Sequence, residues 1–300
     1  MRASAERAGG APIGGAPIGG APIGGATHVA GVIGWPVAHS LSPAIHNAAF
    51  AAAGLDWAYI PLPVALGAMR AAADGLVALG FRGANVTMPH KTQSAVLADE
   101  LTEDAQRLQA VNTFVVDGER LHGHNTDVPG FDRFVRRDAG FDPADRSALV
   151  FGAGGAARAV ALALAAGGLR RLSVAAREAS RADDLVATVR DLPVEVEVVT
   201  FGEAEGLERD LVVNATPLGS DGVTAPPLPA LHEGVLVVDL LYHPAQTPLQ
   251  VAARDSGADA FGGLGMLLHQ AALSFELWTG GPAPLDVMSA AAVTALAELR

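Results

Sequence analysis

Lys91 is the residue whose type most needs a chemical explanation. It is the only lysine in the chain, although lysine and arginine together number 20. Arginine stays protonated under ordinary conditions, whereas lysine can shift its pKa and exchange a proton. A position that needs a cation able to release a proton would therefore keep a lysine. The alternative interpretation is a solvated surface lysine, which is common for this residue type.

Polar residues elsewhere in the chain suggest a ligand site. Ser40 and Ser42 lie in "HSLSP" before an expected helix, where two hydroxyls and the helix N-terminus could hold a carboxylate. Asp127 ends "GHNTD" close to a helix start, and Asn112 lies in "QAVNTF". Each also has a structural interpretation. Ser42 and Asp127 could be helix caps, and Ser40 and Asn112 could be turn residues.

A glycine-rich turn indicates a dinucleotide site. Gly152, Gly154 and Ala157 give the pattern G-x-G-x-x-A directly after an expected strand and at the start of an alanine-rich helix. Glycines in this context let the backbone turn tightly and approach a pyrophosphate, whose charge lies at the helix N-terminus. An ordinary turn into a helix is the alternative interpretation.

The end of the following strand bears on the choice of cofactor. An acidic residue there typically holds the ribose 2′-hydroxyl of NAD, whereas arginines accommodate the 2′-phosphate of NADP. This chain has Arg177 and Arg181 with Glu178 between them. The arginines favour NADP because a guanidinium suits a phosphate, and Glu178 keeps NAD possible. A solvated helix start with paired charges is the structural alternative.

The sequence gives little indication of a metal site or of a reactive thiol. The chain has no cysteine, which excludes disulfides, thiolate metal sites and a cysteine nucleophile. His122 and His124 have an HxH spacing on one strand face, with Asp127 nearby, but the sequence identifies no third ligand. We predict no metal site.

The composition favours a soluble, cytoplasmic, globular protein. Its 300 residues suffice for two domains, each with a core. The net charge of −12 and the lack of a basic run argue against a nucleic-acid partner. No apolar run approaches the ~18 residues that a membrane span needs, and the first ten residues lead into no apolar signal segment.

Strand and helix patterns alternate after an N-terminal tail. Residues 11–25 read "APIGG" three times, a Gly/Pro-rich period too short to bury a core, so residues 1–27 are predicted to be a disordered tail. Beyond it, alternating apolar runs and helical periodicities predict mostly parallel sheets covered by helices. Strands are expected in "SALVF" and at residues 28–34, 57–64, 81–87, 111–117, 120–125, 171–175, 194–199, 210–214 and 235–239, and helices from residue 42 and at 65–79.

These residues together resemble the shikimate dehydrogenase family, from residue 28 to residue 300. Eight blocks in the right order make the resemblance highly specific. They are "GWPVAHSLSPAIHN", "GANVTMPHK", "QAVNT", "GHNTD", "GAGGAARA", "NATPLGS", "DLLYHPAQTPL" and "GGLGMLLHQAA".

The resemblance implies an α/β fold of two domains. An N-terminal α/β domain of residues 28–127 would bind the substrate and carry the catalytic residues, completed by the C-terminal helices of residues 263–300. Residues 128–262 would form a Rossmann domain that binds NADP. The active site would then lie in the cleft between the two domains.

The resemblance also implies roles for single residues. Lys91 and Asp127 match the catalytic pair of the family. The residues expected to bind the substrate are Ser40, Ser42, Thr87, Asn112, Tyr242 and Gln270. The residues expected to bind the cofactor are Gly152, Gly154, Gly155, Ala156, Arg158, Arg177, Arg181, Thr216 and Gly263.

Some positions bear on specificity. The usual "NRT" of the family is "ARE" here, so Ala176 and Glu178 replace Asn and Thr while Arg177 remains, which leaves NAD possible beside NADP. Gly262 stands where an acidic residue or Asn is common, and we have no physical account of its effect. Ser42 in place of threonine fits shikimate better than quinate.

The implied activity is the reversible reduction of 3-dehydroshikimate to shikimate with NADP(H), a step of aromatic amino acid biosynthesis. Lys91 would stabilise the charge that develops on the carbonyl oxygen and deliver a proton, and Asp127 would position it. Alternatives are a quinate/shikimate dehydrogenase using NAD, an aminoshikimate-type relative, and a non-catalytic sensor of a dinucleotide or a shikimate-like acid. A monomer or homodimer is expected.

Overall fold

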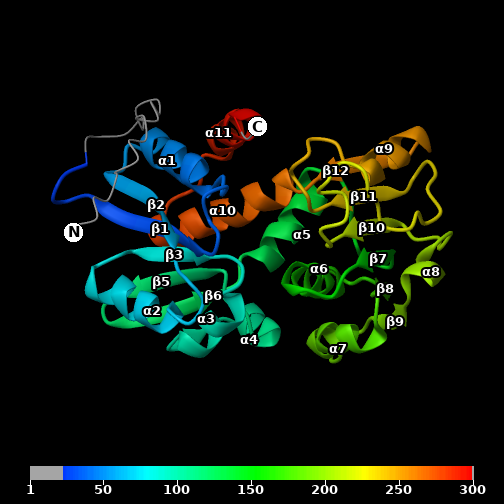
Figure 1. Cartoon of the computed structure of the whole chain (residues 1–300), viewed down its shortest axis with the longest axis horizontal. Helices are drawn as coiled ribbons and strands as arrows, with labels where there is room; N and C mark the ends of the chain where they lie inside the picture. Colours follow the sequence, from blue (N-terminus) through cyan, green and yellow to red (C-terminus); the bar gives the residue numbers. More distant parts are fainter. Residues whose placement is uncertain (1–22, 299–300) are drawn as a thin grey trace, which may run out of the picture.

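Two six-stranded sheets form the framework of the molecule (Figure 1). The computed structural model describes residues 23–298. The first sheet has the strand order β2-β1-β3-β5-β6-β4, and the second has the order β12-β11-β10-β7-β8-β9. Each sheet forms the centre of one lobe, and helices pack around both (Figure 1). The predicted α/β class is confirmed.

The first sheet is mixed. β2, β1 and β3 are parallel neighbours, whereas β5 is antiparallel to both β3 and β6. β5 and β6 form a hairpin across a turn at Gly118 and Glu119, and β4 is a short edge strand that the sequence did not reveal. The helix predicted for residues 65–79 begins later, at Met69. The elements of this lobe are β1 (His28–Gly34), α1 (Ser42–Ala52), β2 (Trp57–Pro63), α2 (Met69–Ala78), β3 (Gly83–Val86), α3 (Lys91–Leu97), β4 (Glu100–Leu101), α4 (Glu103–Leu108), β5 (Thr113–Asp117) and β6 (Arg120–His124).

The second sheet is parallel throughout. Its chain starts at β7 in the middle, proceeds outward to β9 and returns to β10 on the other side of β7. The strand order reverses between β7 and β10, and such a reversal leaves a crevice at the carboxyl ends of the strands where ligands bind. The elements are β7 (Ser147–Phe151), α6 (Gly155–Ala166), β8 (Arg171–Ala175), a 3₁₀ turn η1 (Ala179–Ala182), α7 (Asp183–Val189), β9 (Glu195–Val199), α8 (Phe201–Ala204), β10 (Leu211–Asn214), β11 (Leu236–Asp239), α9 (Pro248–Asp255) and the unpredicted β12 (Asp259–Gly262).

Helices α5 (Asp127–Arg137) and α10 (Leu264–Thr279) connect the lobes, and α11 (Leu285–Glu298) follows α10. α5 packs against both α10 and α6. α10 leaves the second lobe and crosses to the first sheet, and α11 then lies against α1 (Figure 1). The Trp278 indole of α10 donates a hydrogen bond to the Phe114 carbonyl of β5 at 2.9 Å. The predicted domain limits fall at the starts of α5 and α10, and the division into domains remains a prediction.

The predicted tail is only partly within the described residues. Residues 1–22 lie outside them. Residues 24–27 instead form a turn, in which the Gly24 N–H donates to the Thr27 hydroxyl at 2.9 Å. That hydroxyl donates in turn to the Asp56 carboxylate at 2.7 Å, which fastens the start of β1 to the residue before β2.

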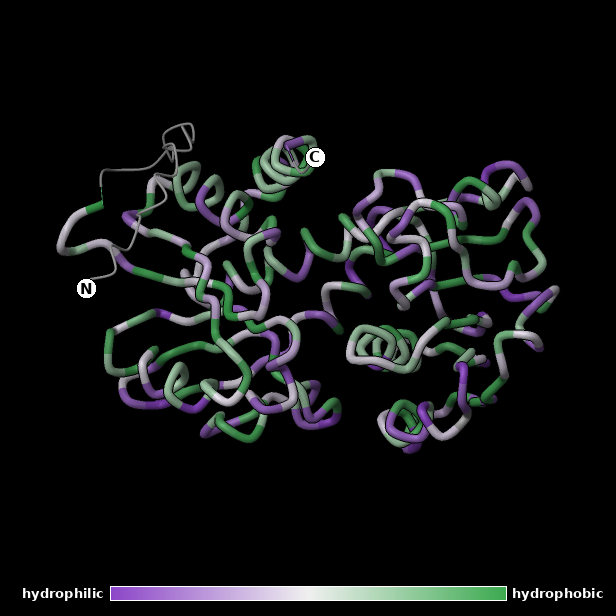
Figure 2. Tube along the Cα trace, in the orientation of Figure 1, coloured by the Kyte–Doolittle hydropathy of each residue, from purple (hydrophilic) through white to green (hydrophobic). Residues whose placement is uncertain are grey.

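Aromatic side chains fill the first lobe between its sheet and α10. Apolar residues follow the strands of both lobes (Figure 2). His46 of α1 stacks on Tyr59 with ring centroids 4.4 Å apart and lies 5.2 Å from the ring of Trp278. The ring is fully buried, and neither of its nitrogens has a hydrogen-bond partner among the described residues. Burial lowers the pKa of His46 to about 3, so the ring is neutral.

Two glycines allow α5 and α10 to approach closely. A Cβ atom on Gly130 would lie 2.9 Å from both the backbone nitrogen and the Cβ atom of Gln270. On the other helix, a Cβ atom on Gly265 would overlap the ring of Phe134. Because only hydrogen fits at either position, the helix contact that carries Gln270 depends on both glycines.

We expect Gly130→Ala to lower the free energy of unfolding by about 1–2 kcal/mol, because overpacking outweighs the better helix propensity of alanine. Gly75→Ala in α2 is the matched control, since a Cβ atom there meets no atom within 4 Å. It should raise the same free energy by about 0.5–1 kcal/mol. Urea unfolding measures both. Two variants of equal stability would contradict the packing argument.

We expect the neutral, buried His46 to make the protein less stable in acid. Its pKa is about 3 in the folded chain and 6.5 as an unperturbed group, so the unfolded state alone gains a proton as the pH falls from 6.5 towards 3. Between pH 7 and pH 5, His46→Phe should therefore lose about 2 kcal/mol less unfolding free energy than the parent chain. Urea titrations at the two pH values test this. Equal losses in the two proteins would refute it.

Candidate active site at the boundary of the two lobes

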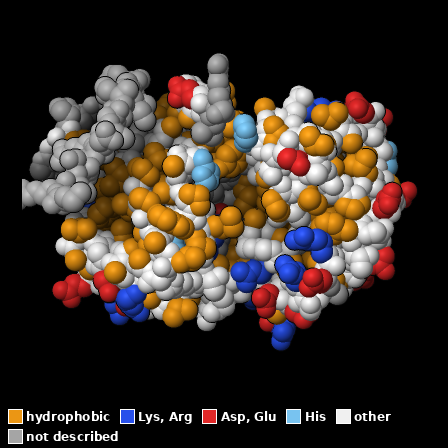
Figure 3. Space-filling view, in the orientation of Figure 1, with side chains coloured by type: hydrophobic (Ala, Val, Ile, Leu, Met, Phe, Trp, Pro, Cys, Tyr) orange, Lys and Arg blue, Asp and Glu red, His pale blue; other side chains and the backbone are white. Residues whose placement is uncertain are grey.

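Two adjoining pockets lie between the lobes. The first, which we call the polar pocket, has a volume of about 240 Å³ and receives residues from β1, the β3–α3 connection, α5 and α10. The second, the glycine-loop pocket, has a volume of about 510 Å³ and lies over the β7–α6 turn. Ala156 lines both pockets. The surface is hollowed along this boundary, with basic side chains at its rim (Figure 3).

Every residue predicted from the sequence to act in catalysis or in substrate binding lines the polar pocket. Gly263, which was assigned to the cofactor, also lines this pocket and not the glycine-loop pocket. The arrangement brings segments from both ends of the chain together, while the role of each residue remains a prediction. The assigned residues that line the polar pocket are Ser40, Ser42, Thr87, Lys91, Asn112, Asp127, Tyr242 and Gln270.

Lys91 and Asp127 form an ion pair in the wall of the polar pocket. The Lys91 Nζ atom donates a hydrogen bond to the Asp127 Oδ2 atom at 2.5 Å. Each is the first residue of a helix, Lys91 of α3 and Asp127 of α5. The exposed fractions of the side chains are 25% for Lys91 and 11% for Asp127. The ammonium is therefore fixed by a carboxylate and still reaches the pocket.

Asn112 holds the second oxygen of this carboxylate. Its amide nitrogen donates to Asp127 Oδ1 at 2.9 Å and to the Thr126 hydroxyl at 3.0 Å. Its amide oxygen accepts the Thr126 backbone N–H at 2.7 Å. Neither Asp127 nor Thr126 caps α5 with its side chain, so the capping interpretation of Asp127 is wrong. An acidic group in the first turn still suits the helix dipole.

A buried hydrogen-bond network extends from this pair to α10. The Asn85 amide nitrogen donates to the hydroxyls of Thr113 at 3.0 Å and Ser274 at 2.9 Å, and the Thr113 hydroxyl donates to the Asn112 oxygen at 3.0 Å. The Tyr59 hydroxyl donates to Asn85 Oδ1 at 2.6 Å. Burial raises the pKa of Tyr59 well above its usual value, which keeps this donor protonated. Asn85 also lines the polar pocket and was not among the residues predicted from the sequence to bind a ligand.

The two serines lie at the start of α1. Ser42 is the first residue of the helix, and the N-cap position is Leu41, so the N-cap interpretation of Ser42 is wrong. The Ser40 hydroxyl accepts the Ser42 backbone N–H at 3.3 Å. Pro43 follows Ser42 in the first turn of the helix. Both hydroxyls therefore lie at a helix N-terminus on the pocket wall, which is favourable for an anion.

The glycine loop has the geometry of an anion cradle. Gly152 has a φ angle of +105°, and a Cβ atom there would lie 3.0 Å from the Ala215 carbonyl oxygen. A Cβ atom on Gly154 or Gly155 would meet nothing within 4 Å. Gly154 is the N-cap of α6 and offers no side-chain cap. The free N–H groups at this helix start can therefore serve a phosphate in the pocket.

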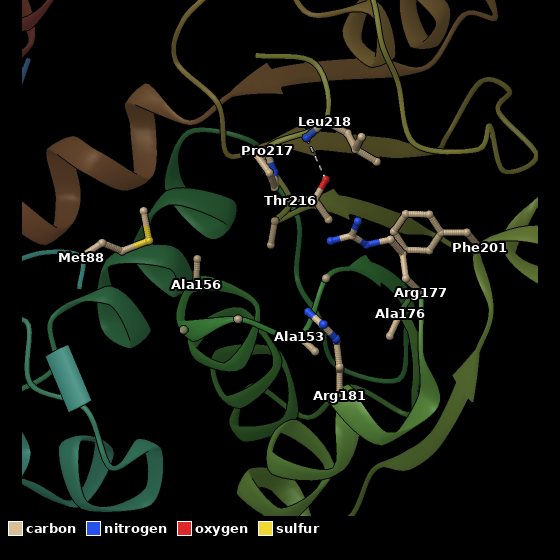
Figure 4. A pocket seen from close by; sticks show the side chains of 14 residues that line it. Met88, Ala153, Ala156, Ala176, Arg177, Arg181, Phe201, Thr216, Pro217 and Leu218 are labelled. Atoms are coloured by element: carbon tan, nitrogen blue, oxygen red, sulfur yellow. Dashed lines mark hydrogen bonds between the residues drawn. The ribbon is translucent and has the colours of Figure 1, made fainter. Parts of the chain in front are cut away.

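The arginines of the glycine-loop pocket differ in their partners. Arg177 and Arg181 both line the pocket (Figure 4). Arg181 forms an exposed ion pair with Glu178 at 3.5 Å, while Arg177 forms no ion pair within residues 23–298. Arg158, which was predicted to bind the cofactor, is half-buried in α6 and lines neither pocket.

Other residues of this pocket were not foreseen. Pro217 and Leu218 follow Thr216 in the "NATPLG" block, so the block itself could have indicated them. Met88 lies in the "GANVTMPHK" block next to Thr87, so that block could have indicated it. Phe201 comes from a distant segment, and no local pattern marks it. The full lining is Met88, Gly152, Ala153, Gly154, Gly155, Ala156, Ala176, Arg177, Arg181, Phe201, Ala215, Thr216, Pro217 and Leu218.

One buried carboxylate of the second lobe fixes the loops that follow β10 and β11. Asp239 accepts hydrogen bonds from the Asn214 amide at 3.0 Å and the Thr247 hydroxyl at 2.6 Å. Asn214 in turn accepts the Thr216 hydroxyl at 2.7 Å, beside the glycine loop. The Leu241 N–H also donates to Asp239, next to Tyr242. Burial raises the pKa of both Asp239 and Tyr242.

The histidine pair does not extend to a metal cluster. The His122 Nδ1 atom lies 3.3 Å from Glu100 Oε2. The pKa of His124 is lowered mainly by burial and to a smaller extent by electrostatic repulsion from the neighbouring His122. Across residues 23–298, no group of three histidine or acidic residues is arranged to hold a metal ion.

Over the same residues, no helix is long and apolar enough to cross a membrane.

Comparison with known proteins places this architecture in a family. The family model "Shikimate dehydrogenase substrate binding domain" matches residues 32–114, and "Shikimate 5'-dehydrogenase C-terminal domain" matches residues 263–293. The shikimate dehydrogenase (NADP(+)) of Moorella thermoacetica is 46% identical over 88% of this chain and 92% of its own length.

Solved structures agree with the sequence comparison. The shikimate 5-dehydrogenase of Thermus thermophilus, in complex with NADP(H) and shikimate, is 38% identical with a TM-score of 0.81, covering 90% of this chain and 100% of the other. The quinate dehydrogenase of Corynebacterium glutamicum, in complex with NAD, is 33% identical with a TM-score of 0.81, covering 89% and 99%. With relatives this similar over almost the full length of both chains, this chain belongs to the shikimate dehydrogenase family.

Proposed function

We propose that this chain is a shikimate dehydrogenase that reversibly reduces 3-dehydroshikimate to shikimate with NADP(H). The observation that carries the proposal is the Lys91–Asp127 ion pair in a pocket that adjoins the glycine-loop pocket at Ala156. A substrate in the first pocket would lie beside a dinucleotide in the second. That proximity is what hydride transfer requires.

The polar pocket offers suitable groups for a hydroxylated ring acid. The Ser40 and Ser42 hydroxyls would bind the carboxylate at the N-terminus of α1. Thr87, Tyr242 and Gln270 would face the remainder of the ring. The phenol of Tyr242 is a hydrogen-bond donor at neutral pH, and burial raises its pKa further above that range.

Asn112 has a different role in the proposal. Both of its amide hydrogens are already used, by Thr126 and by Asp127. We assign it to holding the Asp127 carboxylate in place. It would then affect turnover by positioning the ion pair, in addition to any contact between its oxygen and the substrate.

The Lys91 ammonium has two tasks in the reduction. It stabilises the negative charge that develops on the C3 oxygen, and it donates the proton that this oxygen needs. The resulting neutral amine takes a proton from water, to which 25% of its side chain is exposed. In the oxidation of shikimate, the neutral amine accepts the hydroxyl proton. Proton transfer of this kind typically contributes about 10²–10⁴-fold.

The glycine-loop pocket fits a dinucleotide phosphate. The backbone turn at Gly152 and the open faces of Gly154 and Gly155 leave room for a pyrophosphate at the start of α6. Arg177 and Arg181 would face the 2′-phosphate of NADP. When bound, NADPH supplies the hydride that adds to the carbonyl carbon.

A quinate dehydrogenase that uses NAD is the second candidate. It is favoured by Glu178, an acid beside Arg181 near the expected ribose position, and by the likeness to the C. glutamicum enzyme. Ser42 favours shikimate over quinate. Cytoplasmic location and a monomeric or homodimeric state also remain predictions, the latter open to sizing by light scattering.

Steady-state oxidation of shikimate and of quinate, each with NADP⁺ and with NAD⁺, tests the proposed function. The proposal predicts the highest kcat/KM for shikimate with NADP⁺. Turnover of any pair excludes a non-catalytic sensor. A preference for quinate with NAD⁺ would replace the proposal by its alternative, and no turnover with either acid would overturn both.

Glu178→Gln should shift the cofactor preference further towards NADP. The substitution removes a negative charge near the expected 2′-phosphate and releases Arg181 from its ion pair. Because the pair is exposed, we expect NADP⁺ to bind only about two- to fivefold more tightly. NAD⁺ binding should stay equal or weaken. Titration of both nucleotides measures the ratio, and a ratio shifted towards NAD⁺ would contradict this assignment of Glu178.

A further inference from the structure

Among residues 23–298, Met88 is the one lining residue of the glycine-loop pocket that comes from the first lobe. It follows β3, whereas the other lining residues lie between positions 152 and 218. Its side chain projects at the end of the pocket near Ala156, away from Arg177 and Arg181 (Figure 4). Ala156 also borders the polar pocket. Met88 therefore lies at the end of the glycine-loop pocket that faces the substrate site.

The backbone around Met88 is fixed. Its carbonyl oxygen accepts the Trp35 N–H at 3.1 Å, and the preceding Thr87 N–H donates to the Ile33 carbonyl at 2.8 Å. The same short connection carries Thr87 and Lys91 into the polar pocket. One segment thus brings Thr87 and the Lys91 ammonium to the polar pocket and Met88 to the glycine-loop pocket.

The side chain itself is unusually exposed for an apolar residue. Its exposed fraction is 77%, close to the 76% of Leu79, which lines neither pocket of the cleft. Taken alone, this exposure is explained most simply by an ordinary surface methionine. The placement of Met88 in the pocket wall, at the end where Ala156 lies, argues for a contact with a bound ring. A thioether is flexible and packs favourably against aromatic rings.

We propose that Met88 is a cofactor-contacting residue supplied by the substrate domain, and that its thioether covers the nicotinamide end of the bound dinucleotide. The inference rests on the proposed function. It adds that the hydride donor is held from both lobes. Because Met88 and Lys91 belong to one fixed segment, the contact between Met88 and the nicotinamide holds the ring at a defined position relative to the Lys91 ammonium.

Binding of two ligands to three variants tests the proposal. The ligands are NADPH and adenosine 2′,5′-bisphosphate, which keeps the adenosine half and lacks the nicotinamide. Met88→Ala and Met88→Gln should weaken NADPH binding by about three- to tenfold. Met88→Leu should bind it nearly as the parent does, because it keeps an apolar side chain of similar size. All three should bind the bisphosphate unchanged. Calorimetry on the full chain measures each affinity.

Leu79→Ala is the matched control, since it removes an equally exposed apolar side chain from the same lobe. It should change neither affinity. Unchanged NADPH binding in Met88→Ala and Met88→Gln would overturn the proposal, as would equal weakening of NADPH and the bisphosphate. A parent chain that binds NADPH but oxidises neither shikimate nor quinate would refute the proposed function. The ratio of the affinities for NADPH and for the bisphosphate would still decide the role of Met88.

Discussion

The contact of 2.5 Å between Lys91 Nζ and Asp127 Oδ2 is the interaction on which the site depends. It joins the first residues of two helices that follow different strands of one sheet. A fully buried pair would carry a large desolvation cost and could not exchange protons with water. This pair is buried on the carboxylate side and partly open on the amine side. That asymmetry lets the carboxylate act as a fixed support while the ammonium remains available for chemistry.

The fold supports this contact through polar groups that are mutually satisfied. Asn112 holds the free oxygen of Asp127, and Asn85 and Ser274 connect the same network to α10. The last long helices therefore complete the first lobe by supplying hydrogen bonds as well as apolar packing. Buried networks of this kind stabilise one arrangement only when every member is paired. On the other side of the cleft, Asp239 does the same for the loops that carry Thr216 and Tyr242.

Much of the site was accessible from sequence because its motifs are local. The turn around Gly152 needs glycine for its positive φ, and the single lysine among many arginines indicated Lys91 as the candidate for proton exchange. The contacts that the sequence did not reveal join distant segments. Asn85 and Ser274 are 189 residues apart, and their pairing depends on how α10 crosses the first sheet. Phe201 reaches its pocket in the same way, through the order of strands in the second sheet.

The errors have local causes as well. Ser42 was expected to cap α1, but the helix begins one residue earlier than a cap there requires, and Ser40 accepts the Ser42 N–H. Arg158 follows the glycine loop by only a few residues, yet it lies on a part of α6 that lines neither pocket. β12 is only partly buried, so its short sequence lacks the apolar run that marks β10 and β11.

The central claim is that the site needs a cation that can release its proton. The most direct measurement compares Lys91→Arg with the parent chain in the reduction of 3-dehydroshikimate by NADPH, with the dissociation constant of shikimate determined in parallel. The account predicts that arginine keeps the charge, so shikimate binding changes by no more than about threefold, while kcat falls by at least about 10²-fold because proton transfer is lost. A variant that retains nearly normal kcat would contradict the account.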